Sequence, residues 1–139
     1  MGNIDKHYSR ELISIEGNAP ARDAARLMLT RRIGAVAVRE NGRVVGLVSE
    51  RDLMAATLER QPQHDGPVAR WMRRNLPSVS PRTSDVDCVA LMRDHNTRHL
   101  LVADNARVVG IVSMRDVLRM MLDEKQYLID QLQSYIARG

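Results

Sequence analysis

The feature that most constrains the fold of this chain is a ten-residue phrase that occurs twice. Arg43–Asp52 reads RVVGLVSERD and Arg107–Asp116 reads RVVGIVSMRD, which match at eight of ten positions, 64 residues apart. At the same offset, residues 15–54 align with residues 79–118 without a gap and match at 13 of 40 positions. Such self-similarity indicates an internal duplication. We therefore expect two similar units that share one core, because a half of roughly 60 residues is marginally stable alone.

Each copy is predicted to run strand, helix, strand, turn, strand, helix. In the first copy we expect strands near residues 12–15, 35–38 and 44–48, and helices near residues 20–32 and 50–59. Asn41-Gly42 lies between two apolar runs, which is a strong hairpin signal. Gly17 replaces Pro81 of the second copy and predicts a less regular first strand in the first copy. The predicted fold class is α/β (α+β), with two pseudo-symmetric β-α-β-β-α repeats and a C-terminal helical extension.

We place the first repeat at residues 8–60, a linker with a short helix at 61–74, the second repeat at 75–122 and a C-terminal helix at 123–139. An apolar helical stripe continues beyond the second repeat through Leu118, Met121, Leu122, Tyr127, Leu128, Leu132, Tyr135 and Ile136. No third repeat follows to cover this stripe. It predicts a homodimer, with packing back on its own module as the alternative.

Charge and cysteine content indicate the setting. The chain has 21 Lys+Arg against 17 Asp+Glu, and its only lysines are Lys6 and Lys125. Guanidinium groups suit bidentate phosphate contacts, although most arginines are expected on solvated faces. The single Cys88 excludes an internal disulfide, and its alignment with Ala24 predicts a small buried helix residue. Since no apolar run approaches the roughly 20 residues of a membrane span, we expect a cytoplasmic protein without membrane contact.

The repeated phrase ends in Ser-x-x-Asp, at Ser49 to Asp52 and at Ser113 to Asp116. A serine at a helix N-cap with an aspartate at the third helical position is a capping pair that contributes roughly 1 kcal/mol. Capping does not require an apolar strand that arrives through a glycine, or an arginine directly before the aspartate. A helix N-terminus also offers free N–H groups and a partial positive charge to an anion. A capping role and a ligand-binding role both remain open.

Several features of the chain resemble tandem cystathionine-β-synthase (CBS) repeats. They are the paired Gly-h-h-Ser-x-x-Asp motifs at Gly46–Asp52 and Gly110–Asp116, the helix pairs Leu27-Met28 and Leu91-Met92, and the strand entry Arg98–Val102. The resemblance covers roughly residues 8–122, and the C-terminal segment is similar to that of small stand-alone bacterial twin-CBS proteins. It implies two repeats packed through their sheets into one Bateman module. In that family the aspartate accepts hydrogen bonds from ribose hydroxyls, and the serine binds ribose or phosphate.

The resemblance also implies two clefts, each joining the motif of one copy to the first two strands of the other. Cleft one would comprise Leu47, Ser49, Arg51, Asp52, Pro77, Ser78, Thr97, Arg98 and His99. Cleft two would comprise Ile13, Ile33, Gly34, Ala35, Ile111, Ser113, Arg115 and Asp116.

The two clefts are expected to differ in charge. Arg51, Arg98 and His99 would make cleft one the tighter phosphate site, because charge-assisted hydrogen bonds are strong. Cleft two has Gly34 and Ala35 in the places of Arg98 and His99. Arg98 and His99 could instead form a solvated strand entry, and Gly34 and Ala35 could serve close packing alone.

We therefore expect a regulatory or sensor module that binds AMP, ADP, ATP or NAD in two non-equivalent clefts, coupled to oligomer changes or to an unidentified regulated protein. The alternative is a nucleic-acid-binding accessory protein with an arginine-rich surface, but aromatic residues are 3% of the chain, so stacking platforms are scarce. Catalysis is not expected. His7, His64, His95 and His99 are scattered without a nucleophile, so no catalytic residue, catalytic cofactor or metal ligand is assigned.

Overall fold

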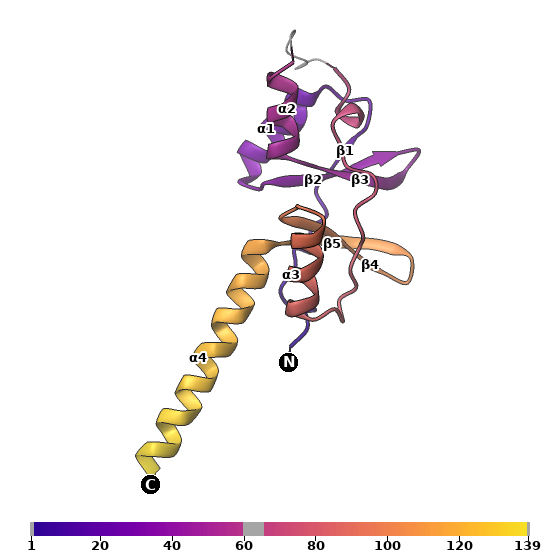
Figure 1. Ribbon diagram of the computed structural model, residues 1–139. Coiled ribbons are helices and arrows are strands. Elements are labelled where there is room, and N and C mark those ends of the chain that lie inside the picture. Colours follow the sequence, from indigo (N-terminus) through magenta and orange to yellow (C-terminus); the bar gives the residue numbers. More distant parts are fainter. Residues whose placement is uncertain (1, 60–65, 139) are drawn as a thin grey trace.

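The computed structural model describes residues 2–59 and 66–138, so part of the expected linker, including His64, and the last residue lie outside the described residues. The elements in chain order are β1 (Ser14–Glu16), α1 (Ala21–Arg31), β2 (Ala35–Glu40), β3 (Arg43–Ser49), α2 (Glu50–Thr57), the short 3-10 helix η1 (Val68–Arg70), α3 (Asp85–Asp94), β4 (His99–Asp104), β5 (Arg107–Ser113) and α4 (Met114–Arg138). Figure 1 shows two units, one above the other, with α4 projecting from the lower one. The predicted mixed α/β architecture of two repeats with a C-terminal helix is confirmed.

The backbone segment before the first strand of each repeat crosses to the sheet of the other repeat. Ser9 and Ile111 form an antiparallel bridge, with N···O distances of 3.0 and 3.2 Å. Arg73 and Leu47 form the equivalent bridge in the other unit, with N···O distances of 2.8 and 3.1 Å. Each sheet therefore gains an edge partner from the other half of the chain.

The same crossing segments fill the two hydrophobic cores. Ile4 and Tyr8, which precede the first strand of the first repeat, are buried in the core of the second. Val68 and Met72, which precede the first strand position of the second repeat at Val79, are buried in the core of the first. Cys88 is fully buried in the second core, as predicted, and burial raises the pKa of its thiol to about 11. Each core thus depends on residues from both halves of the chain.

The glycines of the repeated phrase allow these segments to lie against the strands. A Cβ atom at Gly46 would lie 2.8 Å from the carbonyl oxygen of Arg73, and one at Gly110 would lie 2.7 Å from the ring of Tyr8. Atoms of a real side chain do not approach so closely, so the backbone would have to shift. Close approach of another segment is a recognised reason for glycine within a strand.

The first strand is more regular in the first repeat than in the second, which is the opposite of the expectation. In the first copy β1 pairs in parallel with β2, and the Gly17 amide extends the ladder with a 2.8 Å hydrogen bond to the carbonyl of Arg39. In the second copy Val79 makes only an isolated parallel bridge with Val102. Proline has no N–H to donate, so Pro81, at the position of Gly17, ends the ladder there. The expected irregularity of the first copy was wrong.

Only the first part of α4 packs against the rest of the described molecule. Val117 and Met120 are its buried side chains, and every described residue beyond Glu124 is exposed. Its distal half extends away from both units (Figure 1). No helix in the described part of the chain combines the length and hydrophobicity needed to cross a membrane.

Both hairpins turn through two residues with positive φ. These are Asn41 and Gly42 in the first copy, with φ of 53° and 74°, and Asn105 and Ala106 in the second, with φ of 51° and 65°. This pattern belongs to the type I′ turn, whose twist matches that of the flanking strands. Ala106 therefore holds a conformation that glycine adopts at much lower cost.

Exchanging the turn residues tests this backbone strain. We expect Ala106→Gly to raise the free energy of unfolding by about 0.5–1 kcal/mol, because relief of the left-handed conformation exceeds the added entropy of the unfolded glycine. Gly42→Ala should lower it by a similar amount, since nothing lies within 4 Å of a Cβ at that position and the strain alone acts. Thermal or urea unfolding measures both changes. A lower stability for Ala106→Gly would contradict the assignment.

Candidate functional site

A cavity of about 1050 Å³ lies between the two units. Its walls come from the starts of β2 and β4 and from the first turns of α2 and α4, including Ala35, His99, Glu50 and Asp116. The fold therefore brings two strand entries and two helix N-termini to the same place. We call this the inter-repeat cavity.

Each helix N-terminus carries the capping pair that the Ser-x-x-Asp phrase predicts. At α4, Oδ2 of Asp116 accepts a 2.8 Å hydrogen bond from the Ser113 amide, and the Asp116 amide donates to Ser113 Oγ at 3.0 Å. At α2, Asp52 and Ser49 form the equivalent bonds at 2.8 and 3.2 Å. In both copies Oδ1 of the aspartate has no hydrogen-bond partner among the described residues. Capping therefore occupies only one oxygen and leaves the other available to a ligand.

Backbone bonds join each helix start to the strand entry of its own repeat. The Glu50 amide donates to the carbonyl of Gly34 at 3.0 Å, and the Met114 amide donates to the carbonyl of Arg98 at 2.8 Å. The Asp116 amide donates to Ser113 Oγ, as described above. Of the first three amides of α4, that of Arg115 is therefore the one without an acceptor among the described residues. A free amide at a helix N-terminus is a suitable donor to an anion.

His99 lies where the two repeats meet. Its ring packs against Gly34, where a Cβ atom would be 3.1 Å from the His99 Cε1. Burial lowers the pKa of His99, whereas the carboxylates of Glu50, Asp116 and Asp52 oppose this shift and Arg98 reinforces it. The imidazole is therefore held in its neutral form more strongly than a solvated histidine would be.

The charged groups around the inter-repeat cavity are balanced. Its basic side chains are Arg32, Arg98, Arg115 and Arg119, and its acidic side chains are Glu11, Glu50, Asp116 and Asp123. Its apolar lining includes Ile13, Ile33, Ile111, Met114, Leu118 and Leu122. This lining suits a ligand that combines an apolar ring, hydroxyl groups and an anionic group. Among residues 2–59 and 66–138, no cluster of His, Cys, Asp and Glu is arranged to hold a metal ion.

The structure brings together all of the residues assigned to cleft two. Ile13, Ile33, Gly34, Ala35, Ile111, Ser113, Arg115 and Asp116 all line the inter-repeat cavity. Arg98 and His99, assigned to cleft one, line it as well. Two of the three basic residues expected in the first cleft, Arg98 and His99, therefore lie with the second motif, because His99 and Gly34 are in contact across the boundary between the repeats.

The other residues assigned to cleft one lie outside this cavity. Leu47 is buried and exchanges backbone hydrogen bonds with Arg73. Thr97 turns its hydroxyl to its own strand, where it donates to the carbonyl of His99 at 2.9 Å. Ser49 and Asp52 form the α2 cap described above. The residues Arg51, Pro77 and Ser78 do not line the cavity either.

Several lining residues were missed by the sequence analysis. Leu118, Arg119 and Leu122 follow Arg115 at helical spacing, so the periodicity of α4 carried a signal for them. The sequence carried no signal for Arg32, because the position of this residue depends on its left-handed φ of 55° at the end of α1.

Comparison with known proteins identifies the family. The CBS domain matches residues 4–59 and again residues 68–123. The chain belongs to the CBS domain family, as a tandem pair. The CBS domain-containing protein YhcV of Bacillus subtilis is 29% identical over 117 residues, which cover 84% of each chain. An uncharacterized 17.7 kDa protein of Acidianus ambivalens is 32% identical over 111 residues, or 78% of this chain and 66% of that protein.

Solved structures of CBS pairs have the same fold. A putative signal-transduction protein with CBS domains from Burkholderia ambifaria is 30% identical, with a TM-score of 0.78 over 82% of this chain and 85% of that one. The CBS domain pair of protein MJ0100, solved in complex with 5′-methylthioadenosine and S-adenosyl-L-methionine, is 24% identical, with a TM-score of 0.77 over 89% and 98%. The latter likeness concerns the fold.

The environment of His99 predicts a pH-dependent stability. Its folded-state pKa is lowered below the ordinary value of 6.5, so the unfolded chain binds the proton more readily. The stabilising contribution of neutral His99 should be complete above the unfolded value and decline as the pH falls through it. Chemical unfolding between pH 7.5 and 5.5 should show a steeper loss of stability for the wild type than for His99→Gln. Parallel pH profiles would contradict this assignment.

Proposed function

We propose that this CBS pair is a regulatory sensor that binds an adenosine-containing ligand, such as AMP, ADP, ATP or NAD, in its inter-repeat cavity. CBS-domain proteins of this kind are typically regulatory. The observation that carries the proposal is the carboxylate of Asp116, which lines the cavity with Oδ2 held by the cap and Oδ1 without a partner. The solved complex of the MJ0100 pair with two adenosyl compounds supports this ligand class.

The lining divides into parts that suit the parts of such a ligand. Asp116 Oδ1 is an acceptor for ribose hydroxyls, while Ile13, Ile33 and Ile111 offer apolar surface to the adenine ring. The Arg115 amide and the guanidinium of Arg98 are donors to a phosphate group. These roles require no catalytic group and no metal ion.

The second cleft is proposed as a weaker, non-equivalent site. Asp52 carries the same cap and the same unpartnered oxygen as Asp116. The guanidinium of Arg98 and the imidazole of His99, however, line the inter-repeat cavity. A phosphate-bearing ligand is therefore expected to occupy the Asp116 site first.

The signal of binding is proposed to leave through α4. Leu118, Arg119 and Leu122 on its second and third turns line the inter-repeat cavity, while the helix beyond Glu124 is free of the module. A ligand that contacts these turns differently in two orientations of α4 would shift the population between them. The receiver of this signal is proposed to be a second copy of the chain or a regulated protein.

A second copy is the proposed partner of the distal part of α4. Part of the apolar stripe continues into a 4-3 spacing typical of a coiled coil, at Leu118, Leu122, Lys125, Ile129, Leu132 and Ile136, in which Lys125 is the one charged position. Leu132 is 61% exposed and Ile136 is 74% exposed, so the isolated chain leaves this face in water. Burying it in a second copy removes apolar surface that a monomer cannot cover.

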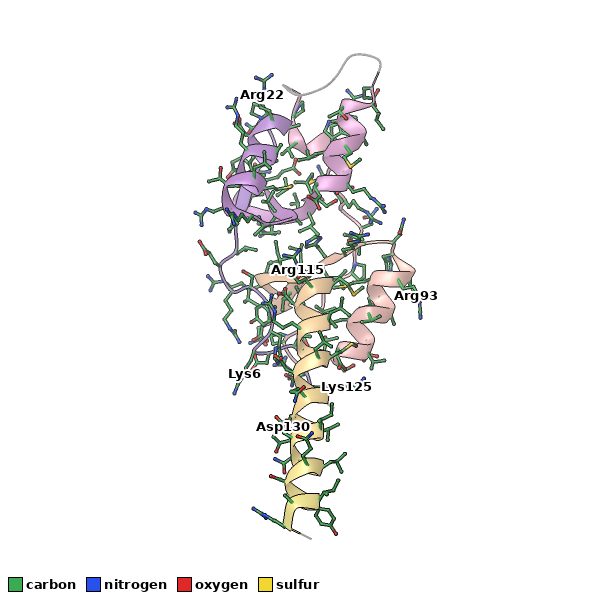
Figure 2. The ribbon with its side chains drawn as sticks, turned by 90° about the vertical axis from the view of Figure 1, so that its left-hand side faces the viewer. Lys6, Arg22, Arg93, Arg115, Lys125 and Asp130 are labelled. Carbon is green, nitrogen blue, oxygen red and sulfur yellow. The ribbon has the colours of Figure 1, made fainter. Side chains whose placement is uncertain are left out.

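Lys125 favours an antiparallel pair. In a parallel pair the two Lys125 side chains would occupy the same core layer, where like charges repel. In an antiparallel pair centred near residue 127, Lys125 instead lies beside Ile129 and Asp130 of the second copy. Figure 2 shows Lys125 and Asp130 on the part of α4 that projects from the module. The same register pairs the remaining layers, Leu118 with Ile136 and Leu122 with Leu132.

An amide substitution separates ligand binding from capping. Asp116→Asn retains an oxygen for the Ser113 amide but places an NH₂ group at the position of Oδ1, so it should keep most of the cap and lose the acceptor for ribose. Calorimetry and thermal shift with AMP, ADP, ATP and NAD should show at least tenfold weaker binding of the preferred ligand. Asp52→Asn is the matched control and should affect the tighter site little. Unchanged affinity in Asp116→Asn would overturn the assigned site.

Charged substitutions on the distal helix test the dimer. We expect a wild-type dimer in sedimentation, and a monomer for Leu132→Glu/Ile136→Glu, because two carboxylates cannot be buried in an apolar layer without a large cost. Gln131→Glu/Ser134→Glu adds the same charge to the opposite face and should remain dimeric. A fully dimeric Leu132→Glu/Ile136→Glu would place the interface elsewhere, for example on the exposed side chains of Leu29 in α1 and Leu58 just after α2.

A further inference from the structure

A second cavity lies between the tips of the two hairpins. Its volume is about 900 Å³, and it shares no lining residue with the inter-repeat cavity. The β2–β3 and β4–β5 turns point the same way, at the opposite end of the strands from the start of α4 (Figure 1). Gly42 and Ala106, from the two turns, both line it. We call it the hairpin cavity.

The charge of the hairpin cavity has one sign. Its charged lining residues are Arg10, Arg39, Arg43 and Arg107, and no Asp or Glu is among its described lining. The lining of the inter-repeat cavity, in contrast, has equal numbers of basic and acidic side chains, with His99 counted as neutral. Four guanidinium groups around one space repel each other, and an anion within the space would remove that cost.

Two of the four arginines are held in place by neighbours. Arg39 Nε donates to Ser14 Oγ at 2.8 Å. Arg10 donates to the Tyr8 hydroxyl at 2.7 Å, stacks over its ring and forms an ion pair with Asp5. These contacts leave the remaining donors of both guanidinium groups available. An arginine whose position is already determined loses less entropy when it binds an anion.

The other two arginines are free to bind a ligand. Arg43 and Arg107 have no hydrogen-bond or ion-pair partner among the described residues. The carboxylates opposite them in the hairpins are occupied, since Glu40 accepts from Arg74 at 2.8 and 3.2 Å and Asp104 accepts from Arg82 at 3.4 Å. Both cross-strand carboxylates are therefore engaged by other arginines.

Duplication places one free arginine on each hairpin. Arg43 and Arg107 occupy equivalent positions of the repeated phrase, so the cavity presents one guanidinium from each hairpin. Two cations on separate elements suit an anion that has phosphate groups at both ends better than a single phosphate. Val44 and Val108 beside them are apolar and offer no competing acceptor side chain.

We propose that the hairpin cavity binds an oligophosphate chain, of the kind found in inorganic triphosphate or a nucleoside triphosphate. Bidentate contacts from Arg43 and Arg107 hold the two ends of the chain, and Arg39 and Arg10 contact its middle. A single-stranded nucleic acid is less suited to the site, because no aromatic side chain lines it to stack a base.

The test uses the full chain and sodium tripolyphosphate as the probe. Calorimetry should show binding to the wild type that weakens as salt is added, and at least tenfold weaker binding to Arg43→Ala/Arg107→Ala. Arg26→Ala/Arg93→Ala removes the same charge from the outer helices α1 and α3 and should bind as the wild type does. Arg98→Ala removes the guanidinium that the inter-repeat cavity would offer to a phosphate, and it should also bind tripolyphosphate normally, which separates this site from the inter-repeat cavity.

Further variants and probes keep the outcome clear. Arg43→Lys/Arg107→Lys retains the charge without the bidentate geometry and should bind with intermediate affinity. Without the probe, the melting temperature of the double alanine variant should not fall, because both side chains are exposed and unpaired. The proposal is overturned if that variant binds tripolyphosphate as the wild type does, or if orthophosphate binds equally tightly. Stronger, length-dependent binding of oligonucleotides through the same arginines would also overturn it.

Discussion

The rest of the structure depends on the exchange of segments between the two repeats. The bridges of Ser9 with Ile111 and of Arg73 with Leu47 attach each repeat to the chain that precedes the other. Because the crossing segments also supply buried side chains, pulling the repeats apart would open both cores at once. The space between the repeats is therefore a fixed feature of the fold. Among the described elements, α4 is the one with a long portion that lies exposed beyond that space.

The capping pairs connect folding with binding. Each aspartate accepts a hydrogen bond from the amide of the N-cap serine through one oxygen and keeps the other oxygen for a ligand. Asp52 and Asp116 therefore stabilise the fold whether or not a ligand is bound. This explains how two copies can retain one phrase while their surroundings diverge. The start of each helix requires the Ser-x-x-Asp phrase for its cap. The residues across the repeat boundary decide which groups surround the free Oδ1 of the aspartate.

The two ends of the paired hairpins offer different electrostatic environments. At the strand entries, arginines and carboxylates lie together among apolar side chains, and burial lowers the pKa of His99. At the turns, arginines line a cavity without acids. The first environment can discriminate among ligands by shape and by hydrogen bonds, while the second attracts anions by charge. One duplicated fold thus presents two kinds of proposed binding site at opposite ends of its hairpins.

The sequence by itself determined the features that depend on local or periodic signals. These are the duplication, the Asn-containing turns, the Ser-x-x-Asp caps, the burial of Cys88 and the membership of the CBS family, each of which is written in neighbouring residues or in a fixed offset. The tertiary structure alone decided that Arg98 and His99 join the second motif, that Pro81 removes a strand and that Arg43 and Arg107 face one cavity. Such contacts join residues far apart in the chain through packing across the repeat boundary. No sequence periodicity specifies that packing, because each repeat's pattern defines only which side chains turn inward.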